Sequence, residues 1–248
     1  SSHRPPVDYI STWLLKEQVD VLAPIITRFA NLSMSSGVFP SSLKLGQITP
    51  LLKKPGLDPT DPASYRPITN LSTLSKILEK LTLSRLRQHI VSSSNFCGFQ
   101  SAYRAAHSTE TALLRVVNDL VIAACNRRAS VLIALDISAA FDTIDHDILC
   151  RRADCEFGIR GPALAWLRSF VSGRSSYVSV GGTNSPVTLN STGVPQGSVL
   201  GPMLFALYTS PVSKIIDHHS LQYDMYADDT QLFVYLFIYT LTRQCEVL

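Results

Sequence analysis

The sequence predicts a mixed α+β fold, arranged as one large domain or two modest ones. Long stretches repeat apolar residues at helical spacing, a short run rich in β-branched residues has the pattern of a buried strand, and two later segments have the pattern of hairpins. With 248 residues and 46% hydrophobic content, the chain is long and apolar enough to bury a core.

The first half is predicted to be mostly helical. Apolar residues recur there every three or four positions, and Ser11 and Ser108 are suitable N-caps. A short strand from 48 to 52 interrupts the helices, and an exposed basic turn at Lys53 and Lys54 follows it. The predicted helices cover residues 10–33, 71–91 and 108–125.

The second half alternates strands and helices. Residues 130–135 are continuously apolar, which predicts a strand buried on both faces, with Asp136 at its C-terminal end. Helices are expected from about Asp145, from 162 to 171 and in the apolar part of 194–208. Hairpins are expected across residues 181–184 and 221–236.

Charge and cysteine content limit the class of protein. Residues 1–130 carry 15 basic and 8 acidic residues, and residues 131–248 carry 7 basic and 11 acidic ones, so the first half suits a polyanion and the second a cation, unless the asymmetry is chance. Five scattered cysteines without a CxxC pair indicate neither disulfides nor zinc. We expect an intracellular protein of the nucleus or cytoplasm, neither secreted nor spanning a membrane.

Three aspartates are the strongest candidates for chemistry. Asp136 ends the predicted strand, and Asp228 and Asp229 lie at the tip of a hydrophobic hairpin, so the fold is able to bring three carboxylates together. Such a cluster repels itself unless cations neutralise it, and hard oxygen ligands suit Mg²⁺. Taken one at a time, a polar turn for Asp228 and Asp229 and a strand-end cap for Asp136 are the better explanations.

The aspartates lie in motifs that resemble a known family. Tyr226-Ala227-Asp228-Asp229 matches the Y-x-D-D box of reverse transcriptases, and Leu-Asp-Ile-Ser-Ala-Ala-Phe-Asp at 135–142 resembles the first aspartate motif of these enzymes. Gly-Val-Pro-Gln-Gly-Ser-Val-Leu-Gly-Pro at 193–202 resembles their Pro-Gln-Gly motif. Further segments resemble the LINE-type (non-LTR) retrotransposon branch, and the likeness covers roughly residues 45–236. These segments are 65–68 with Lys76, 98–100, 107–109 and 158–174.

The resemblance implies a fold and a division of the chain. Residues 1–130 are expected to form an N-terminal helical segment and basic fingers, and residues 131–248 a palm with an antiparallel sheet. After Leu236 the sequence resembles none of the family's thumb segments, so the thumb is expected to be missing. The upstream endonuclease of LINE-type elements has no counterpart in these 248 residues.

The resemblance also implies roles for individual residues. Asp136, Asp228 and Asp229 are expected to be catalytic and to bind two Mg²⁺ ions, with Mn²⁺ as a possible substitute. Phe141 stands at the family's steric-gate position, where an aromatic ring fills the space of a ribose 2′-hydroxyl, although a core aromatic is the simpler interpretation. The glycines of the Pro-Gln-Gly motif are explained equally well by a turn before a helix. Lys76 on an amphipathic helix is equally well explained as a solvated surface charge. The expected nucleotide-binding residues are Arg66, Lys76, Ile137, Phe141, Gln196 and Gly197, and the expected nucleic-acid-binding residues are Lys53, Lys54 and Tyr226.

Two functions remain open at this point. The first is an RNA-directed DNA polymerase that uses two metal ions to join a dNTP to a primer 3′-hydroxyl, with an RNA template and a DNA primer as partners. The second is a catalytically inactive retroelement remnant that only binds nucleic acid through its basic half.

Overall fold

The computed structural model describes residue 8 and residues 10–237. The chain divides into two compact units, which we call the first unit (1–96 and 139–209) and the second unit (97–138 and 210–248). The division near residue 130 that the sequence suggested concerns functional regions, and it stays a prediction.

The first unit is built on helices that enclose an aromatic core. The single helix predicted at 10–33 is two helices with a break at Gln18, and Ser11 caps the first of them through the N–H of Leu14. Phe39 packs edge-on against Trp166 and Phe170, with ring centroids 5.3 and 5.2 Å away. The helices are α1 (Thr12–Glu17), α2 (Val19–Ser36), α3 (Thr73–Val91), α5 (His146–Cys155) and α6 (Gly161–Val171).

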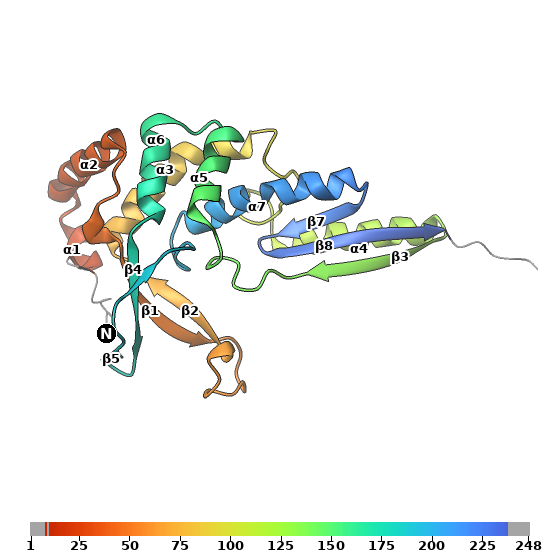
Figure 1. The fold of residues 1–248 in the computed structure, drawn as a ribbon, viewed down its shortest axis with the longest axis horizontal. Coiled ribbons are helices and arrows are strands. Elements are labelled where there is room, and N and C mark those ends of the chain that lie inside the picture. Colours follow the sequence, from red (N-terminus) through yellow and green to blue (C-terminus); the bar gives the residue numbers. More distant parts are fainter. Residues whose placement is uncertain (1–7, 9, 238–248) are drawn as a thin grey trace, which may run out of the picture. The chain divides into compact units, whose positions relative to one another are not determined.

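A five-stranded sheet completes the first unit (Figure 1). Strand β1 pairs antiparallel with β2 and parallel with β4, and β4 also pairs with β5 and β6. Gly181 and Gly182 both have positive φ in the turn between β4 and β5, which confirms the predicted hairpin. The strands are β1 (Leu45–Leu52), β2 (Tyr65–Asn70), β4 (Arg174–Val180), β5 (Thr183–Asn184) and β6 (Thr188–Asn190). A 3₁₀ turn, η1 (Ser41–Leu43), lies between α2 and β1, and a second, η2 (Pro62–Ser64), lies between β1 and β2.

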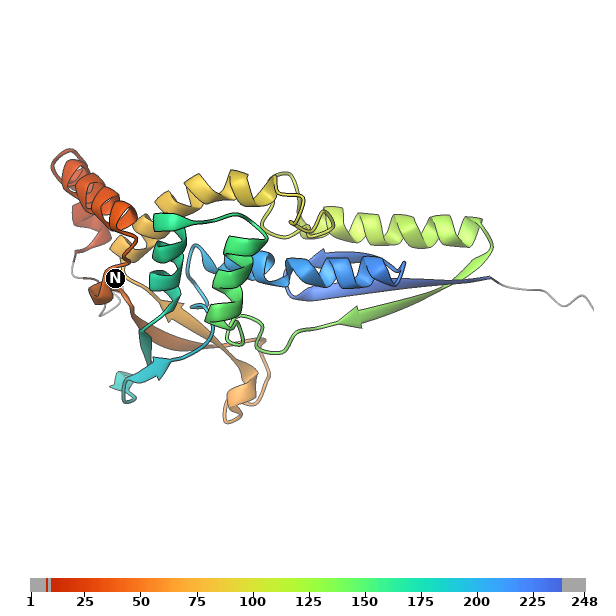
Figure 2. The same cartoon turned by 45° about the horizontal axis from the view of Figure 1, so that its top comes forward.

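The second unit is a three-stranded antiparallel sheet with helices against it (Figures 1 and 2). The strands β3 (Arg128–Leu135), β7 (Gln222–Tyr226) and β8 (Asp229–Phe237) lie in the order β3-β8-β7. Helix α4 (Thr109–Cys125) begins with a capping box at Ser108 and contacts β3 and β7. Helix α7 (Gly201–His218) begins in the first unit and ends in the second, where Ile216 packs with Cys97, Tyr223 and Met225.

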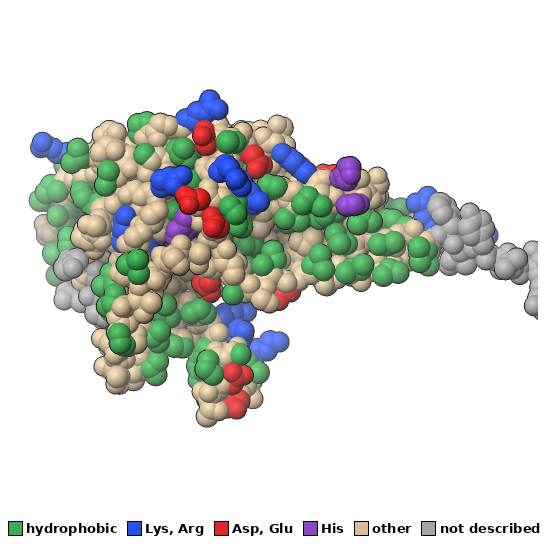
Figure 3. Space-filling model, viewed as in Figure 1, with side chains coloured by type: hydrophobic (Ala, Val, Ile, Leu, Met, Phe, Trp, Pro, Cys, Tyr) green, Lys and Arg blue, Asp and Glu red, His purple; other side chains and the backbone are tan. Residues whose placement is uncertain are grey.

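The prediction that the strand at 130–135 is buried on both faces was wrong. Strand β3 is an edge strand, because among the described residues it pairs with β8 alone. Its apolar side chains remain exposed, as Leu135 is at 48%, and Figure 3 shows hydrophobic side chains gathered over this part of the second unit. A continuous apolar run does not reveal which strands will flank it.

The described part of the chain has neither a membrane-spanning helix nor a disulfide. None of its helices is both long and apolar enough to cross a membrane. Its four described cysteines, Cys97, Cys125, Cys150 and Cys155, are free thiols.

Candidate functional site

The three predicted carboxylates lie at one end of the sheet of the second unit. Asp136 directly follows β3, Asp228 lies in the turn between β7 and β8, and Asp229 opens β8. Leu135 pairs with Thr230 across the β3–β8 ladder, so the next position along each strand places Asp136 beside Asp229. The sheet register therefore brings together residues that are far apart in the sequence.

The carboxyl group of Asp229 is affected by burial and by the two other acids. Burial, and then the negative charges of Asp228 and Asp136, raise the pKa of the Asp229 carboxyl above its ordinary value. Across the described ranges, no three His, Cys, Asp or Glu side chains converge tightly enough to enclose a metal ion. The chemistry of the donor set nevertheless fits a divalent cation, because Mg²⁺ takes carboxylate oxygens and neutralises their mutual repulsion.

The turn that carries two of the aspartates is strained. Tyr226 pairs with Asp229, which leaves Ala227 and Asp228 as the two central residues of a tight hairpin. Ala227 has φ +55°, a left-handed conformation that costs a non-glycine residue roughly 1–3 kcal/mol. Nearby Tyr103 has a raised pKa because of burial and the neighbouring Asp228 and Tyr226. Strain of this kind persists only where the surroundings impose it.

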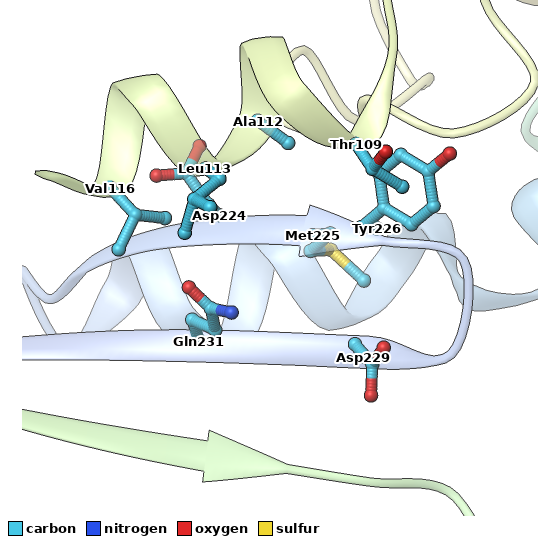
Figure 4. Close-up of a pocket in the computed structure, with 9 residues that line it drawn as sticks. All are labelled: Thr109, Ala112, Leu113, Val116, Asp224, Met225, Tyr226, Asp229 and Gln231. Carbon is cyan, nitrogen blue, oxygen red and sulfur yellow. The ribbon is translucent and has the colours of Figure 1, made fainter.

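A pocket of about 260 Å³ lies between α4 and the β7–β8 hairpin (Figure 4). Asp224 points toward α4 and Asp229 points away from it. The remaining lining of the pocket is mainly apolar. The acidic group of Asp229 therefore lies at one end of the pocket and differs in character from the rest of its lining. The lining residues are Thr109, Ala112, Leu113, Val116, Asp224, Met225, Tyr226, Asp229 and Gln231.

Asp224 is an acid that the sequence gave no reason to single out. It is 5% exposed, and Arg115 Nε approaches its Oδ1 to 3.0 Å, but neither carboxylate oxygen accepts a hydrogen bond from the described residues. Burial raises the pKa of Asp224 to about 6, while Arg115 opposes the shift and Asp119 adds to it. The burial of Asp224 on the face of β7 that α4 covers depends on how the sheet and the helix pack, so the sequence alone does not predict it.

We expect Asp224→Asn to stabilise the chain at neutral pH. The folded state holds the Asp224 proton up to about pH 6, against an ordinary pKa of 3.8, so its contribution to stability is present below pH 3.8 and is lost as the pH rises to 6. The loss is on the order of 3 kcal/mol. Urea unfolding at pH 4 and pH 7.5 measures it: the variant should match wild type at pH 4 and exceed it at pH 7.5. An equal difference at both pH values would contradict the assignment.

The predicted nucleotide-binding loop of the first unit approaches the end of β2 very closely. Thr69 donates its N–H to Gln196 O at 2.6 Å, and a Cβ on Gly197 would lie 2.6 Å from Thr69 O. Gly197 also has φ +116°, so only glycine fits this position without strain. Gln196 Nε2 donates to Asp142 Oδ2 at 3.2 Å, which orients the side chain and adds Asp142 to the residues of this region.

Phe141 is half-buried beside the same loop. Its ring stacks on Phe205 with centroids 5.2 Å apart, and its carbonyl accepts the N–H of Val194 at 2.8 Å. Gly193, at the start of the Pro-Gln-Gly motif, packs directly on the backbone of Asp142, at the end of the first aspartate motif. A Cβ on Gly193 would lie 2.9 Å from that backbone, and Gly193 has φ +83°. The structure brings the Phe141 and Pro-Gln-Gly motifs together within the first unit.

Glu79 anchors the Pro-Gln-Gly loop from helix α3. The carboxylate is fully buried, and its Oε2 accepts the N–H groups of Val199 and Leu200 at 2.6 and 3.1 Å, while Oε1 accepts from Ser75 Oγ at 2.9 Å. Burial raises the pKa of Glu79, against these hydrogen bonds and the charge of buried Arg174. The sequence analysis missed Glu79, and a lone Glu inside a basic helix gave no signal for it.

The basic candidates are accessible. Arg66 on β2 and both Lys53 and Lys54 after β1 are exposed, and Lys76 on α3 is half-buried. None of the four forms an ion pair within residues 10–237. These four residues lie in the first unit with Phe141, Gln196 and Gly197, whereas Ile137 and Tyr226 lie with the three aspartates in the second.

Comparison with known protein families identifies the family of this chain. The family described as reverse transcriptase (RNA-dependent DNA polymerase) matches residues 52–236 of the chain. The chain belongs to this family. The matched residues include the three aspartates and the Pro-Gln-Gly loop, so the resemblance inferred from the motifs is confirmed.

Relatives of this reverse transcriptase chain include proteins of non-LTR retrotransposons from Drosophila melanogaster. The RNA-directed DNA polymerase from mobile element jockey of Drosophila melanogaster is 34% identical over 91% of the chain and 25% of the relative's own length. The probable RNA-directed DNA polymerase from transposon X-element of the same species is 34% identical over 74% of the chain and 20% of its own length. The chain thus spans about a fifth to a quarter of the length of these curated relatives.

Solved structures support the fold alone. Apo telomerase from Candida tropicalis superposes with a TM-score of 0.51 at 16% identity, covering 88% of the chain and 44% of the telomerase chain. A C-terminally truncated form of this telomerase gives a TM-score of 0.50. The predicted α+β reverse transcriptase fold is therefore confirmed.

Proposed function

We propose that this reverse transcriptase chain is the core of an RNA-directed DNA polymerase from a LINE-type retrotransposon. It joins a dNTP to the 3′-hydroxyl of a DNA primer on an RNA template. The observation that carries the proposal is the placement of Asp136, Asp228 and Asp229 at one end of the β3-β8-β7 sheet. The names of the jockey and X-element relatives support the same activity.

The aspartates are proposed to hold two Mg²⁺ ions, which Mn²⁺ is able to replace. When bound, such ions activate the attacking hydroxyl and stabilise the leaving oxyanion. Asp136 and Asp228 would ligate both ions, and Asp229 completes the acidic set. The charges of Asp228 and Asp136 already disfavour ionisation of Asp229, so the protein prepares a local negative potential that a divalent cation relieves.

The first unit is proposed to bind the triphosphate and sugar of the dNTP. Arg66 and Lys76 supply positive charge that stabilises the phosphates as negative charge builds on them. Gln196, oriented by Asp142, contacts the sugar, and Gly197 lets the loop beside it pack closely against the end of β2. The backbone at Ile137 completes the nucleotide-binding set.

Phe141→Ala should reduce discrimination against ribonucleotides. The ring is proposed to occupy the space that a ribose 2′-hydroxyl requires, and its stacking on Phe205 holds it in place. Steric selection against one extra hydroxyl is limited to about 100-fold, so the dNTP-to-rNTP ratio of kcat/KM should fall by up to that factor. Single-nucleotide extension with dTTP and UTP measures the ratio, and Phe141→Tyr is the control that retains a ring. An unchanged ratio would assign Phe141 to the core only.

The nucleic acid is proposed to contact two exposed lysines and one half-buried tyrosine. Lys53, Lys54 and Tyr226 are the assigned residues, and the basic balance of residues 1–130 suits a phosphate backbone. We further propose that residues 1–130 act as fingers and residues 131–248 as a palm. The free thiols suit action inside the cell, in the nucleus or cytoplasm.

Primer extension by the purified chain tests this function. A DNA primer on an RNA template should be extended with dNTPs in Mg²⁺ buffer, and EDTA should stop the reaction. A chain that is folded and binds RNA but extends no primer would instead indicate a remnant that only binds nucleic acid.

A further inference from the structure

The turn that carries Asp228 is held by a segment outside its own hairpin. Met225 donates its N–H to Phe99 O at 3.1 Å, and Ser101 donates its N–H to Met225 O at 2.8 Å. Gln100 and Met225 form a parallel bridge as a result. Residues 99–101 therefore run along the edge of β7 that faces away from β8, immediately beside the turn.

Gln100 hydrogen-bonds to the backbone of Ala227 through both the oxygen and the nitrogen of its side-chain amide. Its Oε1 accepts the N–H of Ala227 at 2.9 Å and the N–H of Ala102 at 3.0 Å, and its Nε2 donates to Ala227 O at 3.2 Å. Gln100 is only 1% exposed, so water does not replace these partners in the folded chain. One side chain thus satisfies both backbone polar groups of a single turn residue.

Ala227 is the position in this turn that needs such support. A two-residue hairpin turn with positive φ at its first central residue strongly favours glycine, whereas this chain has alanine at φ +55°. Without an external constraint, the turn is free to relax toward another conformation. Because Asp228 is the next central residue, any such change moves its carboxylate and the start of β8 with it.

We propose that Gln100 is a positioning residue that fixes the Ala227–Asp228 turn and so places Asp228 and Asp229 for a divalent cation. Gln100 does not contact the substrate or the cation. The inference rests on the proposed function, which assigns these two carboxylates to metal binding. Residues that orient metal ligands commonly change metal affinity by about 10- to 100-fold when they are replaced.

Mn²⁺ binding to the 248-residue chain, followed by electron paramagnetic resonance without nucleotide or nucleic acid, tests the proposal. Gln100→Met keeps the side-chain length and removes all three hydrogen bonds, and it should weaken Mn²⁺ binding about 10-fold. The matched control is Gln222→Met at the exposed start of β7, which should bind like wild type. Wild-type affinity in Gln100→Met would overturn the proposal.

A double-mutant cycle with Ala227→Gly isolates the positioning role. Glycine adopts positive φ without a Cβ penalty, so in the Ala227→Gly background the Gln100→Met change should weaken Mn²⁺ binding by less than about twofold. The cycle also keeps the test available if Gln100→Met alone fails to fold. A loss as large as in the wild-type background would show that Gln100 does not act through Ala227, which overturns the inference.

Asp228→Ala separates this inference from the proposed function. If Asp228→Ala loses Mn²⁺ binding and Gln100→Met does not, the metal assignment stands and the role of Gln100 is rejected. If Asp228→Ala binds Mn²⁺ as tightly as wild type, the assignment of the carboxylates is rejected, and the role of Gln100 is rejected with it.

Discussion

Asp136→Ala is expected to lower Mg²⁺-dependent primer extension by about 100- to 1,000-fold, the order of effect seen when a preorganised electrostatic group is removed from a reacting centre. Asp136 lies beside Asp229 in the register, so its loss removes a carboxylate that no other described residue replaces. The affinity for RNA should change little, because phosphate contacts come from basic side chains. Extension rates and RNA binding at two salt concentrations measure the two effects.

Asp20→Ala is the matched control for this variant. Asp20 is exposed on α2 in the first unit, and its removal changes the net charge by the same amount. Extension by the control should remain at the wild-type rate. Residual extension by Asp136→Ala within tenfold of the control would show that Asp136 is not a metal ligand.

Glu79→Ala should lower the free energy of unfolding by about 3–5 kcal/mol, the range for removing one partner of a buried pair of charges. The change leaves the N–H groups of Val199 and Leu200 without their acceptor and leaves buried Arg174 without its neighbouring negative charge. Urea unfolding at pH 7.5 measures the loss. The Pro-Gln-Gly loop should also loosen, which faster hydrogen exchange at Val199 would report.

Glu17→Ala controls for the loss of a glutamate from a helix. Glu17 is exposed at the end of α1, and its replacement should change stability by less than about 0.5 kcal/mol. If Glu79→Ala were as stable as this control, the carboxylate would not anchor the loop.

The motifs predicted the strands around the candidate site well because they combine local pattern with residue chemistry. The strand before Asp136 and the hairpin around Asp228 were recognisable from their apolar runs, and both are present as β3 and β7–β8. The roles assigned to single side chains at these positions stay predictions. Their test is functional, since the fold alone does not distinguish a ligand from a polar turn.

The residues that the sequence did not reveal act through long-range contacts. Gln100 meets Ala227, 127 positions later in the chain, and Glu79 meets Val199, 120 positions later. Neither periodicity nor a short motif encodes such a pair. The exposure of β3 was missed for a related reason, because burial of a strand depends on the neighbours that tertiary structure provides.

The most direct test of the central claim is incorporation of labelled dTTP on a poly(rA)/oligo(dT) template with Mg²⁺, comparing purified wild type with Asp228→Ala. The account predicts incorporation by wild type and none above background by the variant, with both chains equally folded by circular dichroism. Equal incorporation by both chains would contradict the claim that the carboxylates at the end of the β3-β8-β7 sheet carry the reaction.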